Sequence, residues 1–163
     1  MERDYAWSSR RHYEDMDSPY KIAEEAAERT LKKMNPRKAD TCEIPVVYDP
    51  RVSRTLVSHL AGAINGVSIA RGTSFLLEMM DKQIFPKNIN IIDNPHIIRG
   101  PSSRPFDGEG LPTAFREIVK DGVLKSWTLD LANARKLGLQ STANAARGTS
   151  SPPSPSLSNI ALT

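Results

Sequence analysis

The first clear pattern of apolar and polar positions begins at residue 18 and predicts a helix. Ser18-Pro19 combines a residue suited to the N-cap with a proline suited to the first turn, and Pro36 ends the pattern. Ile22, Ala26, Leu31 and Met34 lie towards one face of this helix. Two acidic and basic pairs at i,i+4 spacing stabilise it: Glu25–Arg29 and Glu28–Lys32.

A second helix begins at Asp49-Pro50, which repeats the combination of a cap residue and a proline. Apolar positions then recur at spacings of three and four, which predicts one buried stripe. The stripe consists of Val52, Leu56, His59, Ala63 and Val67. After the turn Arg71-Gly72-Thr73-Ser74, Thr73 is placed to cap a further helix over SFLLEMM.

Short apolar runs predict several strands in the rest of the chain. CEIPVVYD at 42–49 and INIID at 89–93 are two of them, and Asp121-Gly122 between 114–120 and 123–129 is a strong hairpin signal. Asp130 caps a last short helix, which Gly138 ends. Helices beside an antiparallel hairpin or sheet indicate an α+β fold.

Three regions follow from this pattern. Residues 1–17 are interpreted as a leftover strand or linker from a preceding region, and residues 18–140 as a central α+β region. Residues 141–163 carry one charge and read as a polar loop rich in proline and serine that leads into a further domain. We expect the apolar run Ile160-Ala161-Leu162 to start a strand whose partners lie outside this chain.

Composition narrows the functional classes. The net charge of +3 is modest, and the ten aromatic residues do not interleave with the basic cluster Lys32, Lys33, Arg37 and Lys38, so nucleic-acid binding is not favoured. No apolar run is long enough to span a bilayer. Cys42 is the only cysteine, which fits a reducing cytoplasm.

Candidate metal ligands are sparse. A zinc site needs three or four His, Cys or carboxylate ligands, and helical sites usually take two from one face. His59 has Thr55 and Ala63 one turn away, so no second ligand accompanies it, and we expect it to pack at the edge of the stripe. His12 and His96 lie in irregular segments, and a site assembled from all three histidines stays open as an alternative.

Other candidate chemistry is equally incomplete. Cys42 opens a predicted strand, where a cysteine is usually buried and unreactive. Ser58 cannot form a catalytic dyad with His59, because adjacent helical residues point about 100° apart. Asp107 and Glu109 suggest general acid–base catalysis, but the glycines around them favour a turn. The turn from Arg71 to Ser74 could bind a carboxylate or phosphate, although the capping role explains Thr73 by itself.

Four segments together resemble the TldD/PmbA family, called modulators of DNA gyrase, and are most similar to its PmbA (TldE) branch. They are IARGTSF at 69–75, RPFDGEGLPT at 104–113, DGVLKSWTLDLANARKLGLQSTANA at 121–145 and RGTSSPPSPS at 147–156. The resemblance extends from about Asp17 to Thr163 and corresponds to the middle of a longer family chain. It implies an α+β fold.

The family contains a metallopeptidase branch whose helix carries His-Glu-x-x-x-His shortly before a similar Arg-Gly-Thr-Ser turn. Matching the two turns places Val57 and Gly62 at the histidine positions and Ser58 at the glutamate position. None of these residues can take the corresponding role. The resemblance therefore implies a subunit that is inactive by itself, with no metal or other cofactor of its own.

The same resemblance implies a cytoplasmic complex in which this subunit joins a zinc-bearing TldD-like paralogue to cleave small or unfolded peptides. We expect the hairpin at 114–129 to offer backbone groups to such a peptide. Candidate peptide or partner contacts are Arg71, Gly72, Thr73, Ser74, Asp107, Glu109 and Arg135. Two alternatives are a metallopeptidase with an unrecognised tertiary site and, ranked lower, a modulator associated with DNA gyrase.

Overall fold

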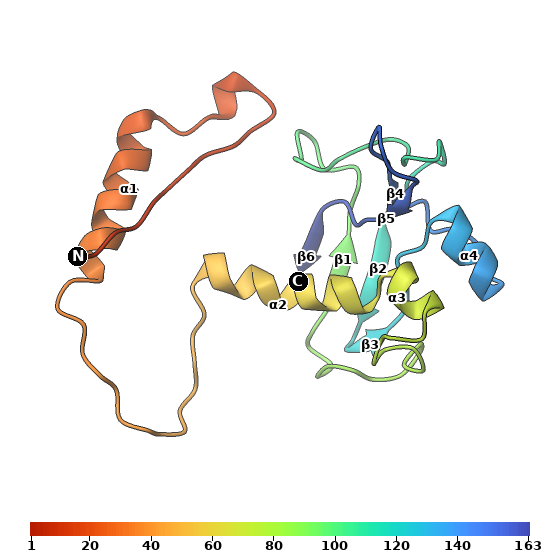
Figure 1. Cartoon of the computed structure of the whole chain (residues 1–163), viewed down its shortest axis with the longest axis horizontal. Helices are drawn as coiled ribbons and strands as arrows, with labels where there is room; N and C mark the ends of the chain where they lie inside the picture. The colour runs from red at the N-terminus through yellow and green to blue at the C-terminus, as the bar shows by residue number, and fades with distance from the viewer. The chain divides into compact units, whose positions relative to one another are not determined.

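The structure is a computed structural model that describes all residues from Met1 to Thr163. Its internal contacts group into two units, Met1–Val47 and Tyr48–Thr163, both drawn in Figure 1. The boundaries expected after residues 17 and 140 stay predictions. None of the helices is both long and apolar enough to cross a lipid bilayer.

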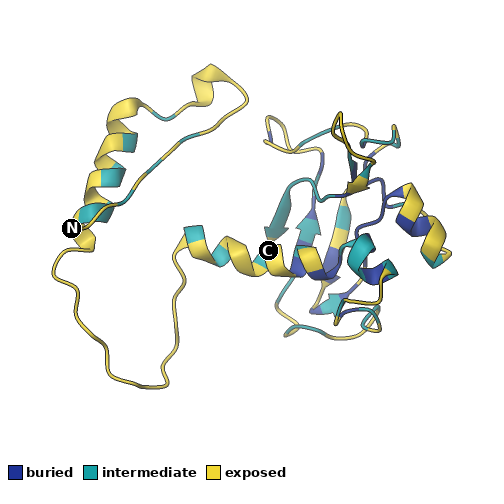
Figure 2. Cartoon of the chain, in the orientation of Figure 1, coloured by how far each residue is buried: buried dark blue, intermediate teal, exposed yellow.

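The first unit consists of a 3₁₀ turn, η1 (Tyr13–Asp15), and the predicted helix α1 (Pro19–Lys32). The Ser18 side chain accepts a hydrogen bond from the Lys21 N–H, which confirms the predicted N-cap. Both predicted i,i+4 ion pairs are present. No residue of α1 is buried, as the absence of dark blue along it in Figure 2 shows.

The strand predicted over 42–49 is wrong. These residues form no helix or strand, and Ile44, Val46 and Val47 are all exposed. Alternating or continuous apolar residues make a strand only where a neighbouring strand pairs with their backbone, and no segment of this chain does so here. Pro45 also lacks the N–H that such pairing would use.

The second unit is built on a four-stranded antiparallel sheet in the order β3-β2-β1-β6. Its strands are β1 (Ile91–Asp93), β2 (Arg116–Lys120), β3 (Val123–Leu124) and β6 (Ile160–Leu162). A separate pair joins β4 (Ala145–Ala146) to β5 (Ser154–Pro155). The sheet and its helices confirm the predicted α+β class.

The predicted hairpin is confirmed between β2 and β3. Asp121 and Gly122 both have positive φ angles, 49° and 75°, as the favoured two-residue hairpin turn requires. Glycine is needed at the second position for a further reason. A Cβ atom on Gly122 would lie 2.1 Å from the Phe85 carbonyl oxygen, which belongs to the loop along the outer side of β3.

Three helices complete the second unit: α2 (Pro50–Ala63), α3 (Gly66–Ala70) and α4 (Leu131–Leu137). Asp49 caps α2 and Asp130 caps α4, as predicted, and Gly138 ends α4 in the left-handed conformation. The helix α2 lies across the sheet and contacts β6 (Figure 1). The core forms where α2 meets the sheet, around Leu60, Ile64, Ile91, Ile118, Val119 and Leu124.

The predicted apolar stripe of α2 is wrong in its first half. Val52 and Leu56 are 49% and 53% exposed, and His59 is exposed rather than packed. The helix instead turns Val57, Leu60 and Ile64 towards the sheet. Both sets have helical spacing, so the pattern alone did not distinguish the two faces.

The helix predicted over SFLLEMM is also wrong, because these residues form successive turns. Ser74 rather than Thr73 accepts the backbone N–H that follows, from Leu76. The Ser74 hydroxyl donates to the Ala63 carbonyl at the end of α2. This local hydrogen bonding offers the backbone an alternative to a helix.

The expectation that Ile160–Leu162 lacks a partner within this chain is wrong. The strand β6 pairs antiparallel with β1, with Ile91 opposite Leu162 and Asp93 opposite Ile160. The polar segment before it is also ordered by pairing, because β4 and β5 lie within it. Local periodicity in the sequence cannot predict a pairing between residues about seventy positions apart.

The buried carboxylate of Asp93 holds this C-terminal segment on the sheet. Asp93 is 1% exposed and accepts hydrogen bonds from the Ser158 N–H at 3.0 Å and the Asn144 side-chain amide at 2.9 Å. The Ser158 hydroxyl also donates to it. Arg116 lies opposite Asp93 on β2, and burial lowers the pKa of Arg116 while the charge of Asp93 raises it.

We predict that Asp93→Ala lowers the free energy of unfolding by about 3 kcal/mol, because it leaves buried donors of Ser158 and Asn144 without an acceptor. Chemical denaturation of the whole chain measures this loss. The matched control is Glu117→Ala, which removes only an exposed ion pair with Lys120 and should change stability by less than about 0.5 kcal/mol. Equal stabilities of the two variants would contradict the role of Asp93.

Candidate functional site

Three pockets lie against α2, and two of them are also lined by the C-terminal segment. The first, the apolar pocket, has a volume of about 510 Å³ and is lined from α2 by Leu56, Val57 and Leu60. The second, the polar pocket, has a volume of about 350 Å³ and is lined from α2 by Ser58, Ala61 and Gly62. All three positions that match the metallopeptidase motif therefore line one pocket or the other.

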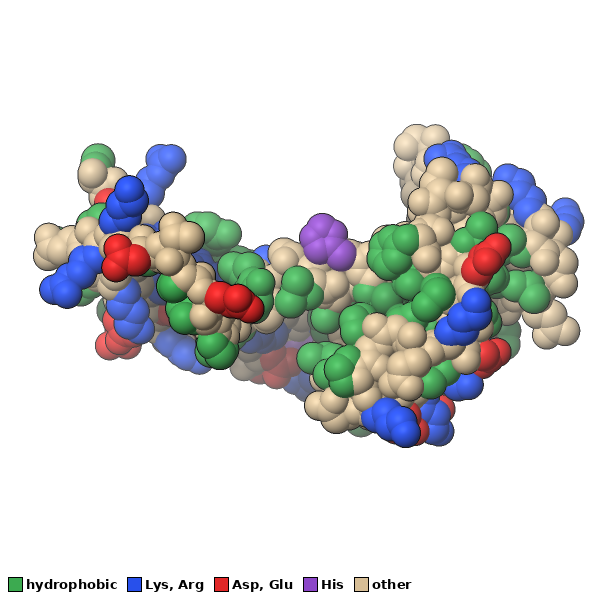
Figure 3. Space-filling model, turned by 90° about the horizontal axis from the view of Figure 1, so that it is seen from below, with side chains coloured by type: hydrophobic (Ala, Val, Ile, Leu, Met, Phe, Trp, Pro, Cys, Tyr) green, Lys and Arg blue, Asp and Glu red, His purple; other side chains and the backbone are tan.

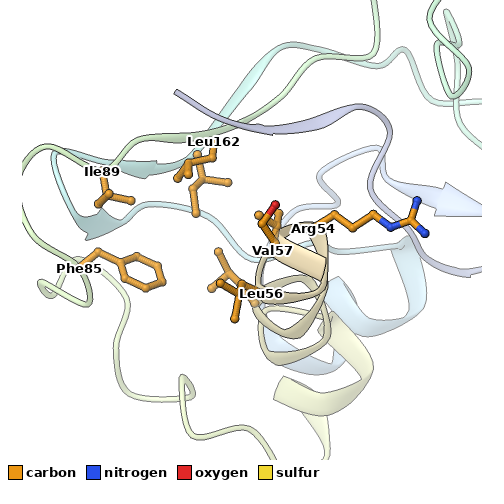
Figure 4. Close-up of a pocket in the computed structure, with 9 residues that line it drawn as sticks. Arg54, Leu56, Val57, Phe85, Ile89 and Leu162 are labelled. Atoms are coloured by element: carbon orange, nitrogen blue, oxygen red, sulfur yellow. The ribbon is translucent and has the colours of Figure 1, made fainter. Parts of the chain in front are cut away.

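The apolar pocket is closed on its other side by Phe85 and Ile89 from the loop before β1, by Ile91 of β1 and by Leu162 of β6. Figure 4 shows Phe85, Ile89 and Leu162 facing Val57 and Leu56 across this space, while the guanidinium of Arg54 points away from it. Hydrophobic side chains also gather on the face of the second unit shown in Figure 3. The pocket thus offers contacts to an apolar group.

The polar pocket combines α2 with two further segments. Asn65 and Thr128 line it beside the helix, and the C-terminal segment contributes Pro155, Ser156, Leu157, Ser158 and Ile160. None of the lining residues carries a charge. The pocket is therefore suited to an uncharged group, because a charge buried there would have no partner.

Most polar side chains around this pocket already have partners. Asn65 donates to the Pro155 carbonyl at 3.1 Å, and Ser58 donates to the Arg54 carbonyl within α2. Thr128 is different, because its residue is 1% exposed and its Oγ1 atom has no hydrogen-bond partner. A buried hydroxyl without a partner costs free energy in the folded state.

The strand β6 contributes to both the apolar and the polar pocket. Asn90 and Thr163 exchange two backbone hydrogen bonds, and Asn94 donates to the Asn159 carbonyl. These bonds hold β6 against β1, so that Leu162 lines the apolar pocket and Ile160 lines the polar pocket.

The predicted hairpin does not present free backbone groups to a peptide. The strand β2 is central in the sheet, and residues 81–84 cover the outer side of β3. Asp81 donates to the Leu124 carbonyl at 2.9 Å, and Leu124 donates to the Lys82 carbonyl at 3.1 Å. The expectation that the hairpin offers free backbone groups to a peptide is therefore wrong.

The turn from Arg71 to Ser74 follows α3 and lies on the surface. Arg71 is exposed, and Gly72 has a φ angle of 70°. The hydroxyls of Thr73 and Ser74 donate to backbone carbonyls of the chain itself, those of Ser68 and Ala63. The role of this turn as a peptide or partner contact stays a prediction.

The carboxylates of Asp107 and Glu109 accept hydrogen bonds from backbone N–H groups of nearby loops. Asp107 is buried and accepts from the N–H groups of Glu109, Leu111 and Ala145, which confirms the interpretation of this segment as a turn. Glu109 accepts from the Leu131 N–H at the start of α4. Arg135 lies exposed on α4 and is not brought next to either pocket.

The side chains along α2 do not fit a zinc ion. Val57 and Gly62 have no donor atoms, and they line different pockets. The exposed His59 has no second ligand beside it, and the chain contains no group of three His, Cys, Asp or Glu side chains able to hold a metal.

Sequence reasoning missed Thr128, Asn65 and Ser158. Each is an ordinary polar residue in an irregular segment, and none of them belongs to a motif with a distinctive spacing. Their shared position depends on contacts between the end of α2, the segment after β3 and the C-terminal segment. No local signal could have found them.

Comparison with known proteins assigns this α+β unit to a family. Residues 41–163 match the family model described as the PmbA/TldA metallopeptidase C-terminal domain. The chain belongs to the PmbA/TldD family.

Individual relatives agree with this assignment. The chain is 44% identical over 145 residues to the metalloprotease PmbA of Escherichia coli O157:H7, covering 89% of this chain and 32% of that relative. It is 29% identical over 126 residues to a metalloprotease TldD homolog of Buchnera aphidicola, covering 77% of this chain and 26% of the relative. The chain thus spans between about a quarter and a third of the length of these curated relatives.

Solved structures show the same fold. A candidate modulator of DNA gyrase from Bacteroides thetaiotaomicron superposes with a TM-score of 0.83 at 28% identity, over 96% of this chain and 33% of that one. TldE from Thermococcus kodakarensis gives a TM-score of 0.78 at 23% identity, over 88% of this chain and 33% of that one. At that identity the second comparison establishes the fold alone.

We predict that the chain binds less than one equivalent of zinc and that a chelator does not unfold it, because Val57, Ser58 and Gly62 supply no ligand set. Elemental analysis after dialysis and thermal melts with and without chelator measure both properties. His59→Ala should leave the zinc content unchanged. One equivalent of zinc that disappears in this variant would overturn the prediction.

Proposed function

We propose that this protein is a non-catalytic, peptide-binding subunit of a cytoplasmic metalloprotease complex, in which a metal-bearing TldD-like relative performs the cleavage. It supplies part of the surface that holds a small or unfolded peptide. The catalytic metal and its ligands belong to the partner.

The apolar and polar pockets against α2 are the observation that carries this proposal. A bound peptide gains selectivity from pockets that accept its side chains. The apolar pocket suits an apolar side chain, and the polar pocket suits an uncharged one.

The side chains of α2 support the non-catalytic part. In a helix that resembles a metal-binding one, valine, serine and glycine stand where two ligands and a base are expected. Substrate activation by zinc requires ligands that leave one coordination position open. The relatives named metalloprotease PmbA and TldD homolog place this chain beside such peptidases by family.

The second candidate is a metallopeptidase whose ligands converge from distant segments. No observation on the donor side chains of this chain favours it. It makes a distinct prediction, because such an enzyme would cleave peptides without its relative.

We predict that the protein alone leaves an unfolded peptide uncut and that it increases cleavage several-fold when mixed with a metal-bearing TldD-like relative. Chromatographic analysis of the peptide products measures both reactions. Cleavage by the protein alone would restore the enzyme alternative. Unchanged activity of the relative after mixing would refute the proposed subunit role.

A further inference from the structure

The third pocket against α2, the aromatic pocket, is built wholly from residues 56–85. It has a volume of about 230 Å³. Three rings line it, those of His59 on α2, Phe75 in the turns after α3 and Phe85 in the loop before β1. The aliphatic side chains that complete its walls are Leu56, Leu60, Leu76 and Ile84. None of its walls comes from the C-terminal segment.

The aromatic pocket adjoins the apolar pocket. Leu56, Leu60 and Phe85 line both of them. Figure 4 shows Phe85 and Leu56 facing one another at the side of the apolar pocket. Alternate side chains of an extended peptide lie on one face, about 7 Å apart. A peptide with one side chain in the apolar pocket can therefore place a second one in the aromatic pocket.

The size and the rings of the aromatic pocket favour one aromatic side chain. Its volume of about 230 Å³ is below the roughly 300–1,000 Å³ that is typical of small-molecule sites. The rings of Phe75 and Phe85 offer edge-to-face or offset-stacked contacts to another ring. An aliphatic side chain would gain apolar burial without these ring contacts.

His59 adds the single polar side chain of the lining. It is exposed, so its imidazole can be reached by a ligand, and no group of the chain hydrogen-bonds to it. A phenol hydroxyl can donate to the unprotonated nitrogen of an imidazole or accept from its N–H. Tyrosine combines a ring for the apolar walls with a hydroxyl for His59.

We infer that the aromatic pocket binds a tyrosine side chain of the peptide, with the ring against Phe75 and Phe85 and the hydroxyl hydrogen-bonded to His59. This inference rests on the proposed peptide-binding function. It adds the class of peptide recognised, one that carries tyrosine close to an aliphatic residue.

Binding of dye-labelled, capped peptides to the whole protein, followed by fluorescence polarisation, tests the inference. The probes are Ala-Leu-Ala-X-Ala-Leu-Ala, with tyrosine, phenylalanine or alanine at X. Leucine on both sides can reach the apolar pocket whichever way the peptide runs. We expect the tyrosine probe to bind about fivefold more tightly than the phenylalanine probe, which should bind about tenfold more tightly than the alanine probe.

The variant His59→Phe tests the hydrogen bond. It keeps an aromatic ring at this position and removes both nitrogens, and the exposed position makes a loss of folding unexpected. We expect the variant to bind the tyrosine and phenylalanine probes equally while it still prefers both to the alanine probe. A merely structural role of His59 would weaken all three probes together.

The variant Phe75→Ala tests the ring contacts. Phe75 is 81% exposed, and Phe106, which is 62% exposed and lines none of the three pockets, provides the matched control. We expect Phe75→Ala to weaken the tyrosine probe about fivefold, and Phe106→Ala to leave its affinity unchanged. Equal affinities of the two variants for this probe would overturn the assignment of the pocket.

The outcomes separate this inference from the proposed function. If the three probes bind equally well, peptide binding stands and the selection of tyrosine is wrong. If His59→Phe keeps the preference for tyrosine over phenylalanine, the role of His59 is wrong. If no probe binds while the protein still stimulates cleavage by its metal-bearing relative, the inference fails alone. If binding and stimulation are both absent, the proposed function fails with it.

Discussion

Closure of β6 onto β1 is the constraint on which the site depends, and the buried carboxylate of Asp93 secures it. This carboxylate receives the Ser158 and Asn144 donors, so it ties the C-terminal segment to the centre of the sheet. From this segment, Leu162 lines the apolar pocket, and Ser158 and Ile160 line the polar pocket. Without the closure both pockets would lose the residues that this segment contributes to their walls.

The helix α2 has two kinds of position, those that anchor it and those that line pockets. Leu60, together with Ile64 at the C-cap, packs in the core against the sheet. Val57 lines the apolar pocket, and Ser58 and Gly62 line the polar pocket. The pocket-facing positions can therefore vary without loss of the core.

Polar side chains in the second unit have two different roles, and burial distinguishes them. Asp107 and Glu109 look like catalytic carboxylates in the sequence, yet their oxygens accept backbone N–H groups and fix loops. Thr128 looks unremarkable in the sequence, yet its buried hydroxyl is unpartnered beside a pocket. The hydrogen bonds therefore show a structural role for Asp107 and Glu109 that residue type alone does not reveal, and their role as peptide or partner contacts stays a prediction.

The sequence by itself determined the features that depend on neighbouring residues. Ser18, Asp49 and Asp130 cap their helices, and Asp121-Gly122 makes the hairpin, because caps and turns depend on a few consecutive residues. Only the tertiary structure decided which face of α2 is buried, that 42–49 has no strand partner, and that Ile160–Leu162 pairs with β1. Each of these outcomes depends on contacts between distant segments. The free energy of such contacts cannot be inferred from a local sequence pattern.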